Sequence, residues 1–117
     1  MSSLDHIGIY VDDLVRSIVF YGELFGYQVA HTMETTNSKI ALLNVGGAFL
    51  EVTQRPDAPG KVSDGPRSHI AFKVDDYNAL ESKLESIGLE LKKGNIGDGR
   101  KKAFFKDPDG HDVEIME

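Results

Sequence analysis

The sequence predicts an α+β fold in which two tandem βαβββ modules form a curved mixed sheet around a cleft. Three observations support this prediction. The segment HIGIYVDD, residues 6–13, returns as HIAFKVDD, residues 69–76, which is 63 positions later. Each copy is followed by one helical pattern and then by strand-like runs. The last run of each half carries a glutamate at its centre, Glu51 or Glu114, again 63 positions apart.

The first module is expected over about residues 4–54. Ile7, Ile9 and Val11 alternate with more polar residues, which predicts a strand with one face on a core. Asp12 and Asp13 then favour a helix start, and Gly26 favours its end. The helix is indicated by the apolar positions Leu14, Ile18, Tyr21 and Phe25. Three strands are expected next, over residues 27–35, 39–45 and 48–53, with Gly46 and Gly47 in the turn between the last two.

The second module is expected over about residues 67–117 and repeats this order. A loop with three prolines, residues 54–68, connects it to the first module. A strand over residues 69–74 precedes Asp75 and Asp76, which favour a second helix start. The helix is indicated by Tyr77, Leu80, Leu84 and Ile87, and Gly88 favours its end. Strands are expected over residues 89–93, 101–106 and 111–116, with the turn DPDG before the last.

The composition limits the classes of partner. The chain has 117 residues, which suits a single domain covering residues 1–117, and it has no cysteine. The net charge is −6, so we expect no nucleic-acid partner. The densest basic spot, Arg100 to Lys102, could close over an anionic substrate, but we interpret it as a solvated loop. No run reaches the ~18 to 20 apolar residues of a membrane span, and no secretion signal begins the chain. These features predict a cytoplasmic protein without a membrane partner.

Four residues share a strand face in this prediction. His6 and His69 begin the first strand of each module, and Glu51 and Glu114 lie in the middle of the last. Their apolar neighbours alternate with them, so all four side chains point away from the helices. If the two sheets curve toward one another, these side chains line one cleft.

Two imidazoles and two carboxylates suit a divalent first-row metal ion, such as Ni, Zn, Co, Mn or Fe. Two carboxylates balance the charge of the ion, and four protein ligands leave room for water or substrate in an octahedral site. The alternative is a metal-free cleft, because a decayed duplication can keep the 63-residue offset without the metal. Seven further side chains share this face: Tyr10, Phe49, Thr53, Ala71, Lys73, Asp112 and Met116. Of these we expect substrate contacts from Tyr10, Phe49, Thr53, Lys73 and Met116.

The paired segments HIGIYVDD and HIAFKVDD, together with FYGELFGY and FFKDPDGHDVEIME, resemble the vicinal oxygen chelate superfamily. That superfamily includes glyoxalase I, methylmalonyl-CoA epimerase, extradiol dioxygenases, and fosfomycin and bleomycin resistance proteins. The resemblance covers nearly the whole chain. It implies metal ligands at His6, Glu51, His69 and Glu114, and a homodimer.

Within the superfamily, the two His–Glu pairs and the DPDG turn look like glyoxalase I, or lactoylglutathione lyase. The resemblance implies a lyase or isomerase that moves a proton through a metal-stabilised enediolate, with Glu114 and Glu51 as the candidate bases. The positions that hold glutathione in bacterial glyoxalases are Tyr10 and Arg55 here, which depart from that pattern. The alternatives are an epimerase, an extradiol dioxygenase, or a metal-free protein that binds a drug in the manner of bleomycin resistance proteins.

Overall fold

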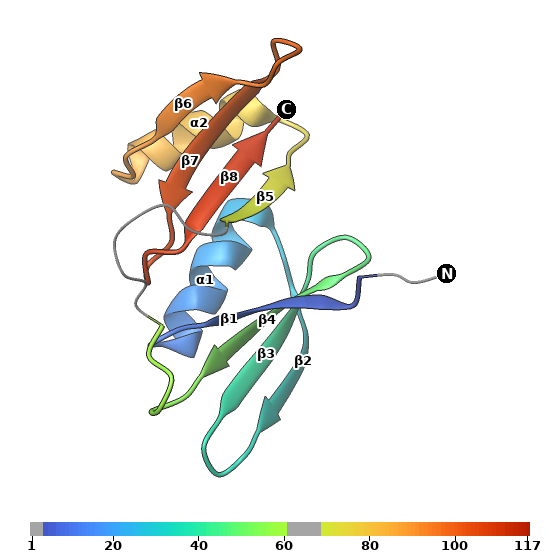
Figure 1. Cartoon of the computed structure of the whole chain (residues 1–117), viewed down its shortest axis with the longest axis vertical. Helices are drawn as coiled ribbons and strands as arrows, with labels where there is room; N and C mark the ends of the chain where they lie inside the picture. The colour runs from blue at the N-terminus through green and yellow to red at the C-terminus, as the bar shows by residue number, and fades with distance from the viewer. Residues whose placement is uncertain (1–3, 61–68) are drawn as a thin grey trace. The chain divides into compact units, whose positions relative to one another are not determined.

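A computed structural model describes residues 4–60 and 69–117 of the chain, and its contacts divide it into two compact units, Met1–Val62 and Ser63–Glu117. Each unit is one βαβββ module, as Figure 1 shows, so the predicted fold class is confirmed.

The N-terminal unit is a four-stranded mixed sheet with one helix. Its strands lie in the order β1-β4-β3-β2, with β1 parallel to β4 and the other neighbours antiparallel. Helix α1 packs on β3 and β4, the two central strands. The elements are β1 (His6–Tyr10), α1 (Leu14–Phe25), β2 (Val29–Glu34), β3 (Lys39–Asn44) and β4 (Phe49–Gln54).

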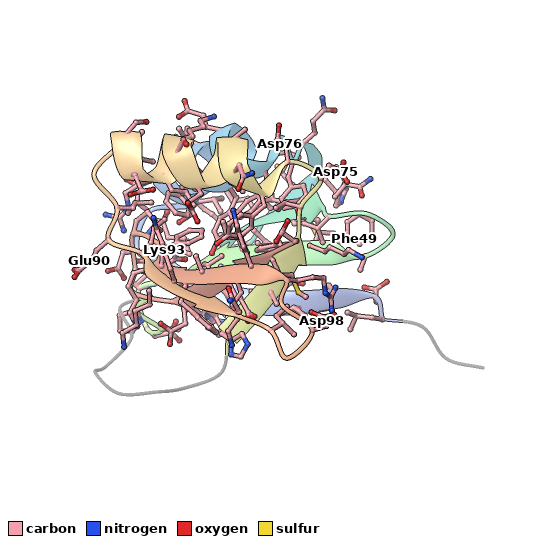
Figure 2. The ribbon with its side chains drawn as sticks, turned by 90° about the horizontal axis from the view of Figure 1, so that it is seen from above. Phe49, Asp75, Asp76, Glu90, Lys93 and Asp98 are labelled. Atoms are coloured by element: carbon pink, nitrogen blue, oxygen red, sulfur yellow. The ribbon has the colours of Figure 1, made fainter. Side chains whose placement is uncertain are left out.

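The C-terminal unit repeats this topology. Its strands lie in the order β5-β8-β7-β6, again with the first strand parallel to the last. Figure 2 shows Asp75 and Asp76 at the start of helix α2, and Lys93 on the side of the sheet that this helix covers. The elements are β5 (His69–Lys73), α2 (Tyr77–Ser86), β6 (Lys92–Asn95), β7 (Lys101–Lys106) and β8 (Asp112–Met116).

Both helices begin at the second aspartate of the repeated segment. The carboxylate of Asp13 accepts a hydrogen bond from the backbone of Arg16, and that of Asp76 accepts one from Ala79. Each carboxylate thereby satisfies one of the unpaired N–H groups of a first helical turn. Helix α1 ends at Gly26, whose φ of 72° is left-handed and favours glycine.

Strand alternation sorts side chains onto two faces in each unit. The positions that face the helix are almost fully buried: Ala41, Leu43, Leu50 and Val52 in one unit, and Ala103, Phe105, Val113 and Ile115 in the other. Tyr21 and Leu24 of α1, and Tyr77 and Leu84 of α2, are buried as well. Each βαβββ unit is therefore stabilised by the hydrophobic effect, because one face of its sheet is buried under its helix.

Two predictions about the strands differ from the structure. The strand expected over residues 89–93 begins only at Lys92, because the backbone N–H of Leu89 still bonds to the carbonyl of Leu84 and so belongs to the end of α2. Ile7, expected on the core face, is 41% exposed. It lies on β1, an edge strand paired only with β4, so less of the unit covers it. Within the described residues, neither helix is long and apolar enough to cross a membrane.

Candidate functional site

The first His–Glu pair comes from the parallel strands β1 and β4. Gly8 lies directly opposite Glu51 in the register, and His6 lies two residues before Gly8 on the same face. The His6 Nε2 atom is 3.4 Å from Glu51 Oε2. Because Gly8 has no side chain, the space beside Glu51 stays open; a Cβ at this position would lie 3.9 Å from Glu51 Oε1.

A residue that the sequence reasoning missed orients His6. The Nδ1 atom of His6 donates to Oδ2 of Asp5 at 2.7 Å, which leaves Nε2 as the atom directed at Glu51. The hydrogen bond to Asp5, with a smaller contribution from the charge of Glu51, raises the pKa of His6. A carboxylate on the far nitrogen of a histidine is the usual arrangement behind a metal-binding imidazole. The sequence signal was the acidic residue directly before the histidine.

The second His–Glu pair comes from β5 and β8. The distance from His69 Nε2 to Glu114 Oε2 is 4.0 Å. Glu114 lies between Ala71 and Phe104 in the sheet and is only 9% exposed. The ring of Phe104 meets the ring of His69 edge to face, with centroids 5.1 Å apart. An aromatic ring therefore supports the second histidine, whereas a carboxylate supports the first.

Each pair has a geometry that fits two ligands of one metal ion. Donor atoms bound at about 2.1 Å lie about 3.0 Å apart at a 90° angle and about 4.2 Å apart at 180°. The separations of 3.4 Å and 4.0 Å fall inside this range. Each pair also combines a neutral nitrogen donor with one negative oxygen donor, which suits a divalent ion. Both pairs lie on the sheet face opposite the buried apolar positions.

The expected substrate contacts lie on the same faces as these pairs. In the N-terminal unit, Tyr10 is opposite Thr53, and Phe49 is opposite His6. Tyr10 is 48% exposed, whereas Thr53 is buried. In the C-terminal unit, Lys73 lies opposite Met116, one row away from Glu114. Their role as substrate contacts stays a prediction.

Arg55, the other position that departs from the glyoxalase pattern, is already engaged. Its guanidinium donates from Nε and Nη2 to the two carboxylate oxygens of Asp57, at 2.8 and 2.9 Å. This bidentate pair lowers the pKa of Asp57. Arg55 therefore forms a local ion pair with Asp57 in the segment directly after β4.

A second group of metal-type side chains lies in the DPDG turn. Asp107, Asp109 and His111 bring ligand atoms within 4.8 Å of one another. However, Asp107 Oδ1 accepts hydrogen bonds from the backbone N–H groups of Asp109 and His111, both at 2.9 Å. The backbone N–H of Gly110 also donates to the carbonyl of Asp107. These hydrogen bonds form the turn between β7 and β8, so the closeness of the three side chains is explained by the turn.

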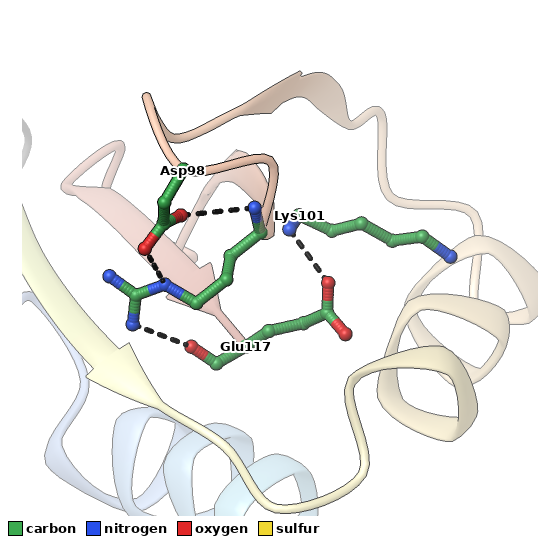
Figure 3. A network of polar contacts seen from close by, with 4 residues as sticks. Asp98, Lys101 and Glu117 are labelled. Atoms are coloured by element: carbon green, nitrogen blue, oxygen red, sulfur yellow. Dashed lines mark hydrogen bonds and ion pairs between the residues drawn. The ribbon is translucent and has the colours of Figure 1, made fainter.

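Arg100 to Lys102 were interpreted from the sequence as a solvated loop, and this interpretation was wrong. Arg100 lies in the turn before β7, and Lys101 and Lys102 belong to that strand. Arg100 donates to the carboxylate of Asp98 and to the backbone carbonyl of Glu117, and the Glu117 carboxylate accepts from the backbone of Lys101 (Figure 3). Lys101 begins β7, and its Nζ donates to Asn78 of α2. Arg100 and Lys101 thus hold the β6–β7 hairpin to the end of the chain and to the helix.

Known proteins are similar to this chain in sequence and in architecture. The chain is 31% identical to the glutathione transferase FosA of Serratia marcescens, over 98% of the chain and 80% of that protein. It is 30% identical to the metallothiol transferase FosB of Lysinibacillus sphaericus, over 98% and 82%. The structure of a trypanothione-dependent glyoxalase I of Leishmania major aligns with a TM-score of 0.83 at 27% identity, over 100% of this chain and 87% of that one.

A family model gives the broadest match. The model described as Glyoxalase/Bleomycin resistance protein/Dioxygenase superfamily matches residues 3–115, which contain both His–Glu pairs and every helix and strand except the last residue of β8. The repeated fold, the paired side chains and this match agree. The chain belongs to the glyoxalase/bleomycin resistance protein/dioxygenase superfamily.

Proposed function

We propose that this protein is a metal-dependent enzyme of the glyoxalase I kind, acting on a small molecule as a lyase or isomerase. His6, Glu51, His69 and Glu114 together bind one divalent metal ion, with modules 4–54 and 67–117 working as one domain. The observation that carries the proposal is the repeated pair, in which each half brings a histidine nitrogen within 3.4 or 4.0 Å of a carboxylate on an open sheet face. The family membership supports it.

The metal ligands and the two glutamates would have different roles in the proposed reaction. When bound, the metal ion supplies positive charge beside two substrate oxygens and so acidifies the neighbouring C–H group. Glu51 and Glu114 are the candidate bases. One of them takes the proton from one substrate carbon and returns it to the neighbouring carbon. Glu51 has open space beside it, at Gly8, in which to turn away from His6. Glu114 is more shielded from solvent and lies beside Phe104 in the strand register.

Metal stoichiometry and turnover test the proposal together. The chain is loaded with Ni, Zn, Co, Mn or Fe in turn, and the expected result is one ion per chain. The loaded protein is then given the hemithioacetal of methylglyoxal and glutathione, and formation of the thioester is followed. Glu51→Gln and Glu114→Gln keep the side-chain shape but remove the base, so the variant whose turnover falls by about 10² or more identifies the proton acceptor.

Glu34→Gln is the matched control, because Glu34 is an exposed strand carboxylate outside both pairs. It should keep both the metal and the turnover. Failure of the wild-type chain to bind any of the five metals, or binding that survives loss of both histidines, would remove the proposal. Metal binding without turnover of the hemithioacetal would keep the site and exclude this substrate, for which Tyr10 and Arg55 already depart from the glyoxalase pattern.

Thiol transfer is the second candidate, and the observation that favours it is the 30–31% identity with the two thiol transferases. In this reaction the thiol sulfur would form a bond to a carbon of an electrophilic substrate, the bond from that carbon to oxygen would break, and the thiol proton would pass to the oxygen. The same four residues would hold the metal ion that stabilises negative charge on that oxygen. Loss of free glutathione in the presence of fosfomycin and the loaded protein measures it. Consumption that requires both the metal and Glu114 would place the chain with the transferases.

A homodimer is part of the proposal. Several large apolar side chains of the N-terminal unit are exposed, including Ile7 on β1 and Val15 and Val19 on α1, at 41%, 70% and 49%. Burial of such side chains between two copies would stabilise a dimer. Sedimentation equilibrium should give twice the mass of one chain, and Val15→Lys with Val19→Lys should give the single mass.

A further inference from the structure

Strand β2, at the edge of the N-terminal sheet, contains a β-bulge that determines on which face of the sheet His31 lies. Val29 is paired with Leu43 of β3. His31, two residues later, is paired with Leu42, the very next residue of β3, so Ala30 is the extra residue of the bulge. Leu43 is buried on the face that α1 covers, and Leu42 therefore points to the opposite, open face.

Without the bulge, the alternation along β2 would place His31 on the helix-covered face. Ala30 would then be opposite Leu42, and His31 would be opposite Ala41, which is fully buried. The bulge turns His31 to the open face instead. Bulges beside functional sites commonly re-aim one side chain in this way.

The described residues of the C-terminal unit pair without such a shift. There Lys92 of β6 is paired with Phe104 of β7, and the pairing continues in step to the end of β6. Phe104 is in turn paired with Glu114, as Leu42 is paired with Glu51. The bulge therefore distinguishes the first unit from the second at an otherwise equivalent place.

His31 lies in the same row of the sheet as Glu51, a proposed metal ligand. Leu42 is paired with His31 on one side and with Glu51 on the other, so the three side chains point to the same face. The backbones of His31 and Glu51 are two strand spacings, or about 10 Å, apart. A ligand chelated beside Glu51 would have to extend about 5 Å further, across Leu42, to meet the imidazole of His31.

The surface between Glu51 and His31 is apolar. Leu42 lies between them, Ile40 follows in the neighbouring row, and Met33, two residues after His31, is 42% exposed. These side chains offer no strong hydrogen bond. A neutral imidazole offers one donor and one acceptor, which matches a hydroxyl or an amide group.

We propose that His31 is a specificity-determining substrate contact, whose imidazole forms a hydrogen bond with an uncharged polar group at the end of the substrate away from the metal ion. This inference rests on the proposed metal site and adds the substrate class to it. The substrate is a small molecule with two chelating oxygens beside Glu51, a short apolar segment over Leu42 and a hydroxyl or amide group at His31.

Two pairs of hydroxamates test this contact, because a hydroxamate chelates a metal ion through two adjacent oxygens. Hexanohydroxamate and 5-hydroxypentanohydroxamate have tails of equal length that end in a methyl or a hydroxyl group. Butyrohydroxamate and 3-hydroxypropanohydroxamate are the corresponding short pair, whose tails end before β2. Binding to the cobalt-loaded protein is followed by its visible absorption. In the long pair the hydroxyl probe should bind about threefold to tenfold more tightly than the methyl probe, and the short pair should show no such preference.

Three variants connect the preference to one side chain. His31→Phe keeps a planar ring but cannot form the hydrogen bond, so it should abolish the preference and leave the affinity for hexanohydroxamate unchanged. His31→Gln restores a donor and an acceptor and should keep part of the preference. Thr32→Val is the matched control, because Thr32 is paired with Ala41 and points to the other face of the same strand. It should change neither value.

The outcomes separate the contact from the metal site. A preference that persists in His31→Phe, that is lost equally in Thr32→Val, or that is absent from the wild-type protein would overturn the contact alone. Failure of every hydroxamate to bind the cobalt-loaded protein would overturn the proposed metal site, and the contact with it.

Discussion

The Oδ2 atom of Asp5 lies 2.7 Å from Nδ1 of His6, so that the opposite nitrogen of the ring is directed at Glu51. This contact joins two residues that are neighbours in the chain and exposed, and it needs no long-range packing. It settles which nitrogen is available as a ligand, because a proton held on Nδ1 leaves the lone pair on Nε2. Asp5 is thereby a positioning residue for the first His–Glu pair.

Replacement of Asp5 should weaken metal binding without unfolding the protein. Asp5→Asn removes the charge that fixes the ring, and loss of such a partner costs about tenfold or more in metal affinity. Competition against a chelator of known affinity measures the change. Since the Asp5 side chain is 83% exposed, the metal-free variant should melt at the wild-type temperature. Asp75→Asn, an exposed carboxylate of the other unit, is the control, and an equal loss in both variants would contradict the role of Asp5.

Metal removal should lower the melting temperature of the loaded protein. An ion that binds the folded chain and not the unfolded chain stabilises it by about 2.7 kcal/mol at a hundredfold excess over the dissociation constant. For a chain of this size, that corresponds to a shift of several degrees or more. Calorimetry with and without a chelator measures the shift. His6→Ala should abolish it, and a shift of the same size in that variant would show that the stabilising ion binds elsewhere.

The glycine at position 60 is expected to tolerate no side chain. A Cβ on Gly60 would lie 2.4 Å from the Cα of Val11 and 2.7 Å from the backbone nitrogen of Asp12, and these backbone atoms cannot move away. The N–H of Gly60 also donates to Asp12 Oδ1 at 2.7 Å. Gly60→Ala should therefore cost about 1 to 3 kcal/mol or more of stability in urea unfolding. Gly97→Ala, where a Cβ would meet nothing within 4 Å, should change it by less than about 0.5 kcal/mol.

Alkaline pH should destabilise the protein through Tyr77. Burial, together with the hydrogen bond to Glu81, raises the pKa of Tyr77 to about 12, above its ordinary value of 10.0. Between these values the unfolded chain releases the proton while the folded chain keeps it. Stability is therefore fully present below pH 10 and falls as the pH rises toward 12, by at most about 1.4 kcal/mol per pH unit.

Urea unfolding at several pH values between 8 and 11.5 measures this dependence. Tyr77→Phe cannot ionise, so its stability should fall less steeply above pH 10 than that of the wild-type protein. Tyr10→Phe removes a tyrosine that is 48% exposed and should keep the wild-type slope. Equal slopes in all three proteins would show that Tyr77 contributes nothing to the alkaline loss.

The helix and strand pattern was predictable wherever it depended on local periodicity. Both helix starts, at Asp13 and Asp76, were indicated by a capping residue before an apolar pattern. The strand expected at residue 89 was wrong at its start because the C-terminal turn of α2 extends to Leu89, through a bond that residue types alone do not specify. The sequence likewise indicated one basic patch at Arg100, Lys101 and Lys102. In the structure these side chains have different partners, and Lys101 and Lys102 point to opposite faces of the sheet.

The sequence alone determined the duplicated fold and the face on which each histidine and glutamate lies, because repetition and alternation are properties of the chain itself. Tertiary structure decided what depends on distant partners: the approach of His6 to Glu51 and of His69 to Glu114, the fit of Gly60 against Val11, and the engagement of Arg100 and Lys101 that leaves Lys102 beside Phe104. The physical reason is that such contacts join residues far apart in the chain, and only packing and strand register bring them within a few ångströms.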